Sequence, residues 1–341
     1  LPLVQVAQTL AQKYDVVVTN PPYMGASNMN SDLSEYVKKY YPDSKSDLFA
    51  VFIEVCSRMA KQNGYQAMIT QHAWMFLSSF EKLREKMMLT ETVSMAHLGA
   101  RAFEEIGGEV VQTTSFVRCR IHIDDYKGTY CRLIEPTSQQ GKEDMFLAGE
   151  NRYFANQDNF AKIPGSPVAY WISDSFADVF CRGMVKQYGD TKKGMFTGNN
   201  DLWLKFWFEV ENCKIGKQFK PYNKGGTYRK WYGNNDYIVD WKDDGEDIKK
   251  YKGSGNINDK FYFIRCVTWS LITTGKPSFR LIDDKAHVMG DAGPTAIFGD
   301  DTKLYYALAS LNSVVTEEAS YVINPTINLS SGVGANLPLY I

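Results

Sequence analysis

Residues 14–23 read Tyr14-Asp15-Val16-Val17-Val18-Thr19-Asn20-Pro21-Pro22-Tyr23, and this stretch decides the fold of the chain. Its β-branched part, which ends at Thr19, predicts a strand that is buried on both faces of a parallel sheet. Asn20 stands where that strand ends. Because ligands in open α/β sheets bind beyond the carboxyl ends of the strands, the residues from Asn20 to Tyr23 also mark a candidate functional site.

Helical and strand patterns alternate along the chain around this stretch. Apolar residues at helical spacing predict a helix from about Asp47 to Gln62, which Ser46 or Asp47 can cap and Asn63-Gly64 can end. The other expected elements are a helix over 1–13, a helix with a capping-box pattern at Ser78, and strands at 65–70, 93–98, 110–119 and 130–134. The later strands follow one another without a helix, so we expect an α/β sheet that ends in antiparallel strands.

The pattern weakens into polar and turn residues between about 135 and 170. We therefore predict a first domain over 1–135 and a linker over 136–190 with a bridging helix around Ser175–Gln187. From 191 to 341 the chain changes to glycine and asparagine doublets, many Trp and Tyr residues and short strand patterns. This predicts a second, α+β region, and a chain of 341 residues is long enough for two domains.

Composition excludes several classes of protein. The net charge of -1 gives no general sign of nucleic-acid binding, so any DNA footprint must be local. The six cysteines show no metal-ligand spacing, which favours free thiols in a reducing cytosol and no metal site. We find no apolar run near the roughly 20 residues of a membrane helix, so we expect a soluble, cytoplasmic protein. The first residue is Leu1 rather than Met, which suggests a piece of a longer protein.

Asn20, Pro21, Pro22 and Tyr23 indicate one particular chemistry. An exocyclic adenine amine is a poor nucleophile because its lone pair is delocalised into the ring. The side-chain oxygen of Asn20 and the carbonyl of Pro21 can accept the two N–H bonds of that amine and aim its lone pair at an electrophilic methyl group. The prolines stiffen the loop, and Tyr23 offers a flat face for an extruded base. The alternative is a rigid turn followed by a core tyrosine.

The same residues resemble catalytic motif IV of amino-group DNA methyltransferases. Three later segments resemble the motifs that follow in the gamma class of these enzymes: Lys45–Glu54, Gly64–Thr70 and Phe103–Thr114. The whole run looks most like the PglX methyltransferases of bacterial BREX phage-defence systems. The resemblance implies a class I (Rossmann-like) methyltransferase sheet, a site-specific adenine-N6 DNA methyltransferase activity, S-adenosylmethionine as cofactor and double-stranded DNA as substrate.

The resemblance also implies further roles. Phe103 is the candidate for stacking on the opposite face of a flipped adenine, with an ordinary core aromatic as the alternative. Other phage-defence proteins are candidate partners. The gamma order places a glycine-rich cofactor motif upstream of motif IV, but only 19 residues precede Asn20. Gly25 and Gly107-Gly108 do not form the strand–turn–helix unit that the cofactor needs, so we expect the isolated chain to lack the main cofactor site and to be inactive.

The second region holds a local basic run that favours DNA contact. Six basic residues and no acidic one lie between 214 and 230, and aromatic residues are interleaved with them. The candidate DNA-binding residues are Lys220, Lys224, Arg229, Lys230, Trp231, Asn199 and Asn200, the asparagines because their amides suit adenine edges. A solvated basic face and turn-forming asparagines are the alternatives. Resemblance to target-recognition regions covers 195–202 and 324–328, and recognition elements are expected to continue beyond residue 341.

Two other functions remain open at this point. The same Asn-Pro-Pro-Tyr sequence serves enzymes that methylate the glutamine side chain of a protein, although those enzymes are compact and lack a second region of this size. The chain is alternatively a non-catalytic DNA-recognition module of a defence complex. His72 follows the strand at 65–70 and is a candidate to line the site, but a satisfied histidine near the core is the commoner outcome.

Overall fold

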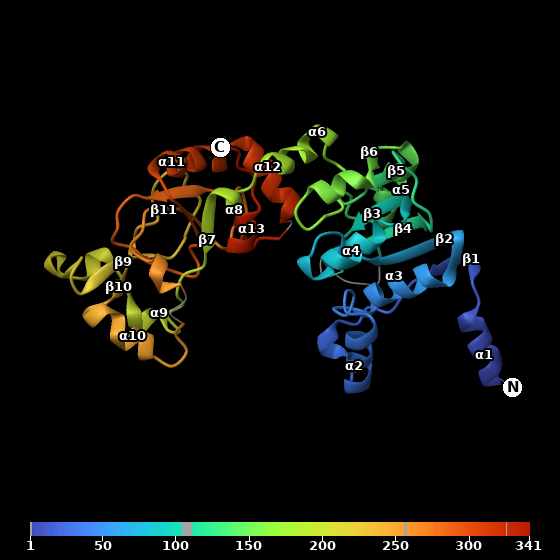
Figure 1. The fold of residues 1–341 in the computed structure, drawn as a ribbon, viewed down its shortest axis with the longest axis horizontal. Helices are drawn as coiled ribbons and strands as arrows, with labels where there is room; N and C mark the ends of the chain where they lie inside the picture. Colours follow the sequence, from blue (N-terminus) through green and yellow to red (C-terminus); the bar gives the residue numbers. More distant parts are fainter. Residues whose placement is uncertain (1, 104–110, 256–257, 325) are drawn as a thin grey trace. The chain divides into compact units, whose positions relative to one another are not determined.

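The computed structural model describes residues 2–103, 111–255, 258–324 and 326–341. The chain forms two compact units, Leu1–Ala177 and Asp178–Ile341. Each unit has its own sheets and its own hydrophobic core, and each is described here by itself (Figure 1). Within the described residues, no helix is long and apolar enough to cross a bilayer.

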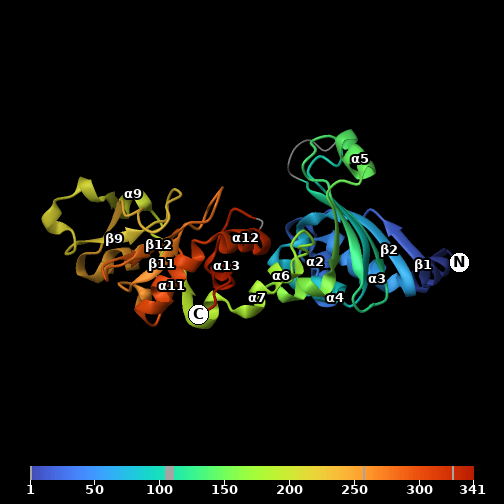
Figure 2. The same cartoon turned by 90° about the horizontal axis from the view of Figure 1, so that it is seen from above.

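The first unit is built on a six-stranded sheet with the order β1-β2-β4-β3-β5-β6 (Figures 1 and 2). Its strands are β1 (Tyr14–Thr19), β2 (Ala60–Gln71), β3 (Glu91–Gly99), β4 (Thr113–Cys119), β5 (Lys127–Arg132) and β6 (Arg152–Asn156). Strands β1 and β2 are parallel, whereas β4 runs antiparallel to both of its neighbours and β6 antiparallel to β5. The expected α/β sheet with antiparallel strands at its end is confirmed.

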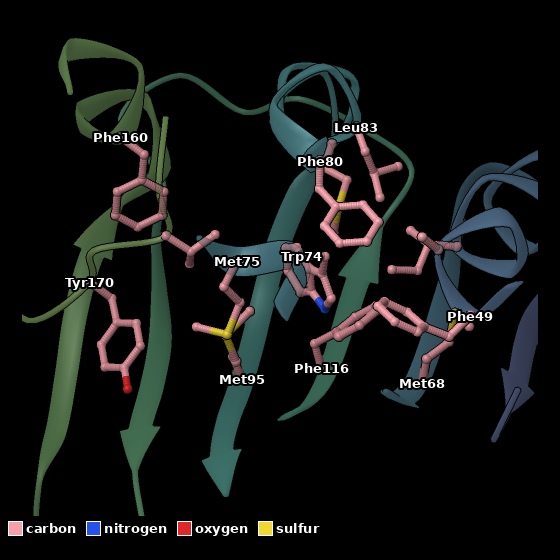
Figure 3. Packing of buried hydrophobic residues seen from close by; sticks show 14 of the residues in the cluster. Phe49, Met68, Trp74, Met75, Phe80, Leu83, Met95, Phe116, Phe160 and Tyr170 are labelled. Carbon is pink, nitrogen blue, oxygen red and sulfur yellow. The ribbon is translucent and has the colours of Figure 1, made fainter. Parts of the chain in front are cut away.

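Helices α3 and α4 pack against one face of this sheet. The helices of the first unit are α1 (Pro2–Ala11), α2 (Ser31–Tyr40), α3 (Leu48–Met59), α4 (Glu81–Met87), α5 (Gln139–Ala148) and α6 (Asp174–Ala177). Phe49 and Ile53 of α3 and Leu83 of α4 meet Met68, Met95 and Phe116 of the strands in one buried cluster (Figure 3). The helix expected at Asp47 is confirmed, and Asp47 is its N-cap.

Two of the expected element boundaries are wrong. Helix α3 ends at Met59 because the chain enters β2 at Ala60, which pairs with Tyr14 of β1, so Asn63-Gly64 lie inside the strand. The capping box expected at Ser78 does not form. Residues Ser78–Phe80 make a 3-10 turn instead, and α4 begins at Glu81 without a side-chain cap.

Strand β1 is present as expected, but it is not buried on both faces. Val17 packs against the core, whereas Val16 is 54% and Val18 is 72% exposed. The reason is the position of β1 at an edge of the six-stranded sheet, where no described element covers the face that carries these two valines. Three consecutive valines therefore give β1 two apolar faces, of which the described residues cover only one.

Residues 136–190, expected as a linker, are largely folded. Helix α5 and strand β6 lie in this segment, and β6 extends the sheet by pairing with β5. The bridging helix is broken into α6, α7 (Val179–Arg182) and α8 (Val185–Tyr188). Gly183 interrupts it with an extended backbone, and a Cβ there would lie 2.5 Å from the carbonyl oxygen of Leu339. The boundary between the two units falls between Ala177 and Asp178.

The second unit contains two four-stranded sheets, with the orders β13-β9-β10-β8 and β12-β11-β14-β7. Their strands are β7 (Gly189–Lys192), β8 (Leu204–Phe206), β9 (Phe219–Asn223), β10 (Tyr237–Asp240), β11 (Cys266–Trp269), β12 (Phe279–Ile282), β13 (Val288–Met289) and β14 (Thr295–Phe298). The remaining helices are α9 (Asn200–Trp203), α10 (Glu246–Lys250), α11 (Asp301–Leu311), α12 (Val314–Ile323) and α13 (Ser331–Ala335). The mixture of short strands and helices confirms the α+β expectation.

A buried polar chain joins three segments of the first unit. Nδ1 of His72 lies 2.9 Å from Nε2 of His97, and Nδ1 of His97 lies 3.0 Å from the hydroxyl of Tyr170. Burial lowers the pKa of His72 to about 4, and burial together with the charges of His72, Arg132 and Lys142 lowers the pKa of His97 to about 3. Both histidines are therefore neutral in the folded protein near pH 7.

We expect the stability of the first unit to fall as the pH drops below 6.5. Above that pH the histidines are neutral in both states, whereas below it only the unfolded chain takes up protons readily. Between pH 6.5 and 5 the loss is about 1.6 kcal/mol for each histidine, because the slope rises from half of its limit of about 1.4 kcal/mol per pH unit at pH 6.5 to nearly that limit at pH 5. Urea unfolding of the wild type and of His97→Phe at both pH values measures it. The variant should show a shallower pH dependence, and equal slopes would contradict the assignment.

Candidate active site

The segment from Asn20 to Tyr23 forms a loop directly after β1. It leaves the sheet at the carboxyl end of the strand, where Thr19 of β1 is in register with Met68 of the parallel strand β2. Asn20 and Pro22 are exposed, Pro21 is buried and Tyr23 is half-buried. The Asn20 amide is thus accessible at the sheet edge where an α/β fold places its ligands, while Pro21 anchors the loop in the protein.

Tyr23 is held against the core rather than standing free. Its ring meets Phe49 of α3 edge to face, with the ring centroids 6.0 Å apart. Its hydroxyl is buried and has no hydrogen-bond partner among the described residues. Burial raises the pKa of Tyr23, and the negative charge of Asp47 raises it further. The ring is therefore fixed in place and neutral, with part of its surface available for contact.

Asp47 clamps the far end of this loop to α3. Its Oδ1 accepts a hydrogen bond from the backbone N–H of Met24 at 3.0 Å and from that of Phe49 at 3.3 Å. The carbonyl of Met24 in turn accepts from the N–H of Leu48 at 3.0 Å. Burial raises the pKa of Asp47, and its backbone hydrogen bonds offset part of that rise. One carboxylate thus caps the helix and fixes the chain just after Tyr23.

This arrangement provides hydrogen-bond acceptors in a fixed loop. The side-chain oxygen of Asn20 and the carbonyl of Pro21 are the acceptors that sequence reasoning named. The loop between them and Asp47 is stiffened by two prolines and closed by the clamp, so little rearrangement is needed when a substrate amine arrives. Within the described residues, no group of His, Cys, Asp and Glu is placed to hold a metal ion.

Phe103 lies in a different environment from Tyr23. It lines a hollow of about 510 Å³ together with Leu98, Leu133 and Phe146. Lys142 lies in the wall of this hollow and donates to the carbonyls of Leu98 and Leu133, each at 2.7 Å. No ring contact joins Phe103 to Tyr23 in the described part of the chain. The stacking role of Phe103 stays a prediction, and the neighbouring residues 104–110 lie outside the described residues.

The basic run of the second unit is less uniform than its sequence indicates. Lys220 donates to the carbonyl of Gly216, Lys224 lies 4.1 Å from the ring centroid of Tyr237, and Lys230 donates to the carbonyl of Asn312 at 2.8 Å. Arg229 is exposed, and among the described residues its guanidinium group forms no ion pair and no hydrogen bond, although its backbone N–H donates to Ser278. Of the four predicted DNA-binding cations, Arg229 is thus the one with its charge uncommitted.

The two predicted recognition asparagines are engaged within the protein. Asn199 caps α9 by accepting from the N–H of Leu202 at 3.2 Å, and Oδ1 of Asn200 accepts from the hydroxyl of Thr197 at 2.7 Å. Trp231, in contrast, is 52% exposed. Contacts of these residues with base edges remain predictions.

Sequence reasoning missed two features of these sites. Asp47 was expected only as a helix cap, and the spacing of 23 residues to Met24 gave no signal of its second role. Arg280 was not singled out at all, although it is a cation only 1% exposed in the second unit. An arginine within the apolar strand pattern Phe279–Ile282 was the available signal for it.

Comparison with known proteins places these features in a family context. Residues 4–99 match the family model of the Eco57I restriction-modification methylases. The chain is 43% identical over 99% of its length to the adenine-specific methyltransferase PglX of Lacticaseibacillus casei (strain Zhang), of which it covers 30%. It is 39% identical, again over 99% of its length, to the adenine-specific methyltransferase BrxX of Escherichia coli O9:H4 (strain HS), of which it covers 29%. The chain therefore spans about a third of the length of these curated relatives.

The fold has a counterpart among solved structures. The Type IIL restriction-modification enzyme MmeI, solved in complex with DNA, superposes with a TM-score of 0.55 at 10% sequence identity. That likeness covers 90% of this chain and 44% of MmeI, so it includes parts of both units. At this level of identity the comparison speaks for the fold alone.

The Asp47 clamp gives a test that requires no substrate. Asp47→Ala removes both acceptor contacts, so we expect the free energy of unfolding to fall by about 1–2 kcal/mol. We also expect the Met24 amide to exchange faster with deuterium. Asp47→Asn retains an oxygen acceptor and should change both quantities little. Asn30→Ala is the matched control, because it removes the N-cap of α2 and should leave exchange at Met24 unchanged. Unchanged Met24 protection in Asp47→Ala would contradict the clamp.

Proposed function

The chain is related over nearly its whole length to part of the adenine-specific methyltransferases PglX and BrxX, and from this relationship we propose that it belongs to a site-specific adenine-N6 DNA methyltransferase of bacterial phage defence or restriction-modification. In this proposal the substrate is an adenine flipped out of double-stranded DNA, and S-adenosylmethionine supplies the methyl group. The observation that carries the proposal is the exposed Asn20 at the carboxyl end of β1, followed by the buried Pro21 and the clamped loop.

The chain's own residues have distinct tasks in the proposed reaction. Asn20 and the carbonyl of Pro21 accept hydrogen bonds from the adenine amine and favour the geometry in which its lone pair can attack. Tyr23, held by Phe49, stacks on the base. Flipping costs a few kcal/mol, and a platform that is already fixed offsets part of this cost. Phe103 contributes a second aromatic contact in this proposal.

The second unit is the proposed DNA target-recognition region. Its candidate contacts are Lys220, Lys224, Arg229, Lys230, Trp231, Asn199 and Asn200. MmeI was solved in complex with DNA and shares the fold across most of this chain, which supports the assignment of a DNA-binding role. We place the protein in the cytoplasm, where DNA is accessible, with other phage-defence proteins as proposed partners.

The described residues do not fit a complete site for S-adenosylmethionine. The loop that follows β1 leads into a 3-10 turn, and its Gly25 pairs with Asp47 rather than forming a glycine-rich turn before a helix. Val16 and Val18 expose an apolar face on a strand type that is normally covered on both sides. We propose that a further layer outside residues 1–341 covers this face and carries the main cofactor site.

Replacing Asn20 tests the proposed chemistry. In protein that extends beyond residues 1–341 as the relatives do, Asn20→Ala should lower adenine-N6 methylation by at least about 100-fold, because an acceptor needed in the transition state is lost. DNA affinity should change little. Mass spectrometry of digested DNA measures the methylation, and Asn28→Ala, an exposed asparagine eight residues further on, is the matched control.

Other outcomes of that experiment support other functions. Methylation that is unchanged in Asn20→Ala would contradict the catalytic role and favour a non-catalytic DNA-recognition module. If the wild type methylates a protein glutamine but not DNA, and Asn20→Ala no longer methylates that glutamine, the result would favour a glutamine-directed enzyme.

Cofactor affinity tests the incomplete site. We expect calorimetry to detect little or no binding of S-adenosylmethionine to residues 1–341, and clear binding to a protein that includes the upstream region. Replacing Val16 and Val18 by threonine should weaken the longer protein but leave the stability of residues 1–341 nearly unchanged. Micromolar binding to residues 1–341 alone would contradict the proposed division.

A further inference from the structure

A loop of the second unit presents three exposed aromatic rings. In this loop, residues 228–232, Tyr228 is 56%, Trp231 is 52% and Tyr232 is 71% exposed. Exposed rings of this size that lie within five consecutive residues are a usual sign of a contact surface. Arg229, whose charge is uncommitted, lies among them.

Trp231 is attached rigidly to the sheet. Its N–H donates to the carbonyl of Phe279 at 2.9 Å, and its carbonyl accepts from the N–H of Leu281 at 2.8 Å, so it pairs with Arg280 of β12. Its backbone is left-handed, with φ of 76°. A bulky residue adopts this conformation only where the surrounding structure imposes it. The backbone that carries the ring is therefore fixed by the sheet, and about half of the side-chain surface stays exposed.

The sheet position paired with Trp231 carries a buried cation without a counter-charge. Arg280 is 1% exposed, and among the described residues no carboxylate forms an ion pair with it. Its hydrogen bonds to Arg229, Ser270 and Ser278 are all 3.3 Å or longer, and its Nε has no partner. Burial, together with the positive charge of Arg229, lowers the pKa of Arg280 to about 10. At neutral pH both guanidinium groups are charged, and their common field favours an anion.

The geometry points to a stacking role for this loop: Trp231 inserts its ring against the bases of double-stranded DNA, while Arg229 and the field of Arg280 hold the adjacent phosphates. This inference rests on the proposed function and assigns the tasks within its recognition region. The combination fits a nucleic acid because its phosphates are attracted by the positive charges of Arg229 and Arg280, and its bases can stack on the exposed rings of the loop. It also explains the rigid attachment, since a ring that must enter a base stack is more effective when it does not have to be ordered first.

Photochemical crosslinking tests the contact directly. The probe is a duplex pool of random sequence in which 5-iodouracil replaces thymine, incubated with the 341-residue chain and irradiated. Stacked aromatic side chains crosslink to this base, whereas simple electrostatic attraction does not require such contact. We expect crosslinked peptides to map to residues 228–232, and crosslinks confined to other segments would overturn the inference.

Variants separate stacking from charge. Trp231→Ala should weaken binding to the same pool about 5- to 100-fold, the loss of one stacked base, without changing the slope of log affinity against log salt. Arg229→Ala should weaken binding and reduce that slope by about 1. Trp231→Phe should recover most of the affinity. Trp231→Gly, which suits the left-handed backbone, should bind as weakly as Trp231→Ala and guards against misfolding of the loop.

Trp207 provides the matched control. It is 54% exposed, close to the value for Trp231, but it lies in a 3-10 turn beside Glu209. Trp207→Ala should leave DNA affinity unchanged. If Trp231→Ala binds DNA as the wild type does, the inference fails while the proposed function stands. If the wild type binds no DNA even at low salt, the proposed recognition region and this inference fail together.

Discussion

The carboxylate of Asp47 is the interaction on which the candidate active site depends. It joins two backbone N–H groups that are distant in sequence, one after Tyr23 and one in the first turn of α3. Because α3 is packed into the core through Phe49, the rigidity of the core is passed on to a loop whose first residue is exposed. A half-buried carboxylate is unfavourable by itself, and these hydrogen bonds to backbone groups compensate for its lost hydration. The loop is consequently fixed by the hydrogen bonds of Asp47, while the ring of Tyr23 is held by its apolar contact with Phe49.

The six-stranded sheet explains why the candidate site lies at the edge formed by β1 and why one face of β1 is exposed. Helices α3 and α4 cover one side, and the apolar cluster there includes side chains from β2, β3, β4 and β5. That single covered face is enough to order β1 and the loop behind it. On the other face of β1, two valines are exposed to solvent. In a complete α/β fold, a strand this rich in valine is usually covered on both faces. The described residues thus order the loop from Asn20 to Tyr23 through one face of the sheet, while the face of β1 that carries Val16 and Val18 stays exposed among them.

How much of this could be predicted depended on the range of the interactions involved. The strand up to Thr19, the loop from Asn20 and the cap at Asp47 follow from local patterns, and the structure has the strand and the cap as expected. The burial of β1, the pairing of β6 with β5 and the early end of α3 depend on partners far along the chain, which periodicity does not reveal. The basic run shows the same difficulty. Its sequence predicts free positive charges, but Lys230 donates a hydrogen bond to the carbonyl of Asn312, 82 residues away.

Electrostatic attraction and base stacking place different demands on a protein, and in the proposed recognition role the second unit meets them with different residues. Attraction to phosphates is screened over a Debye length of about 8–10 Å. It therefore acts at a distance and tolerates mobile lysine side chains. Stacking acts at contact, so a ring that is free to rotate loses much of its benefit to ordering. A backbone-held tryptophan next to a buried, uncompensated arginine satisfies both demands at one point, because the buried charge is less screened than a surface lysine. The unsatisfied Nε of Arg280 and the left-handed backbone of Trp231 are each unfavourable for folding alone. In the proposed complex with DNA, the bound polyanion offsets the positive charge of Arg280, which lies at the sheet position paired with Trp231.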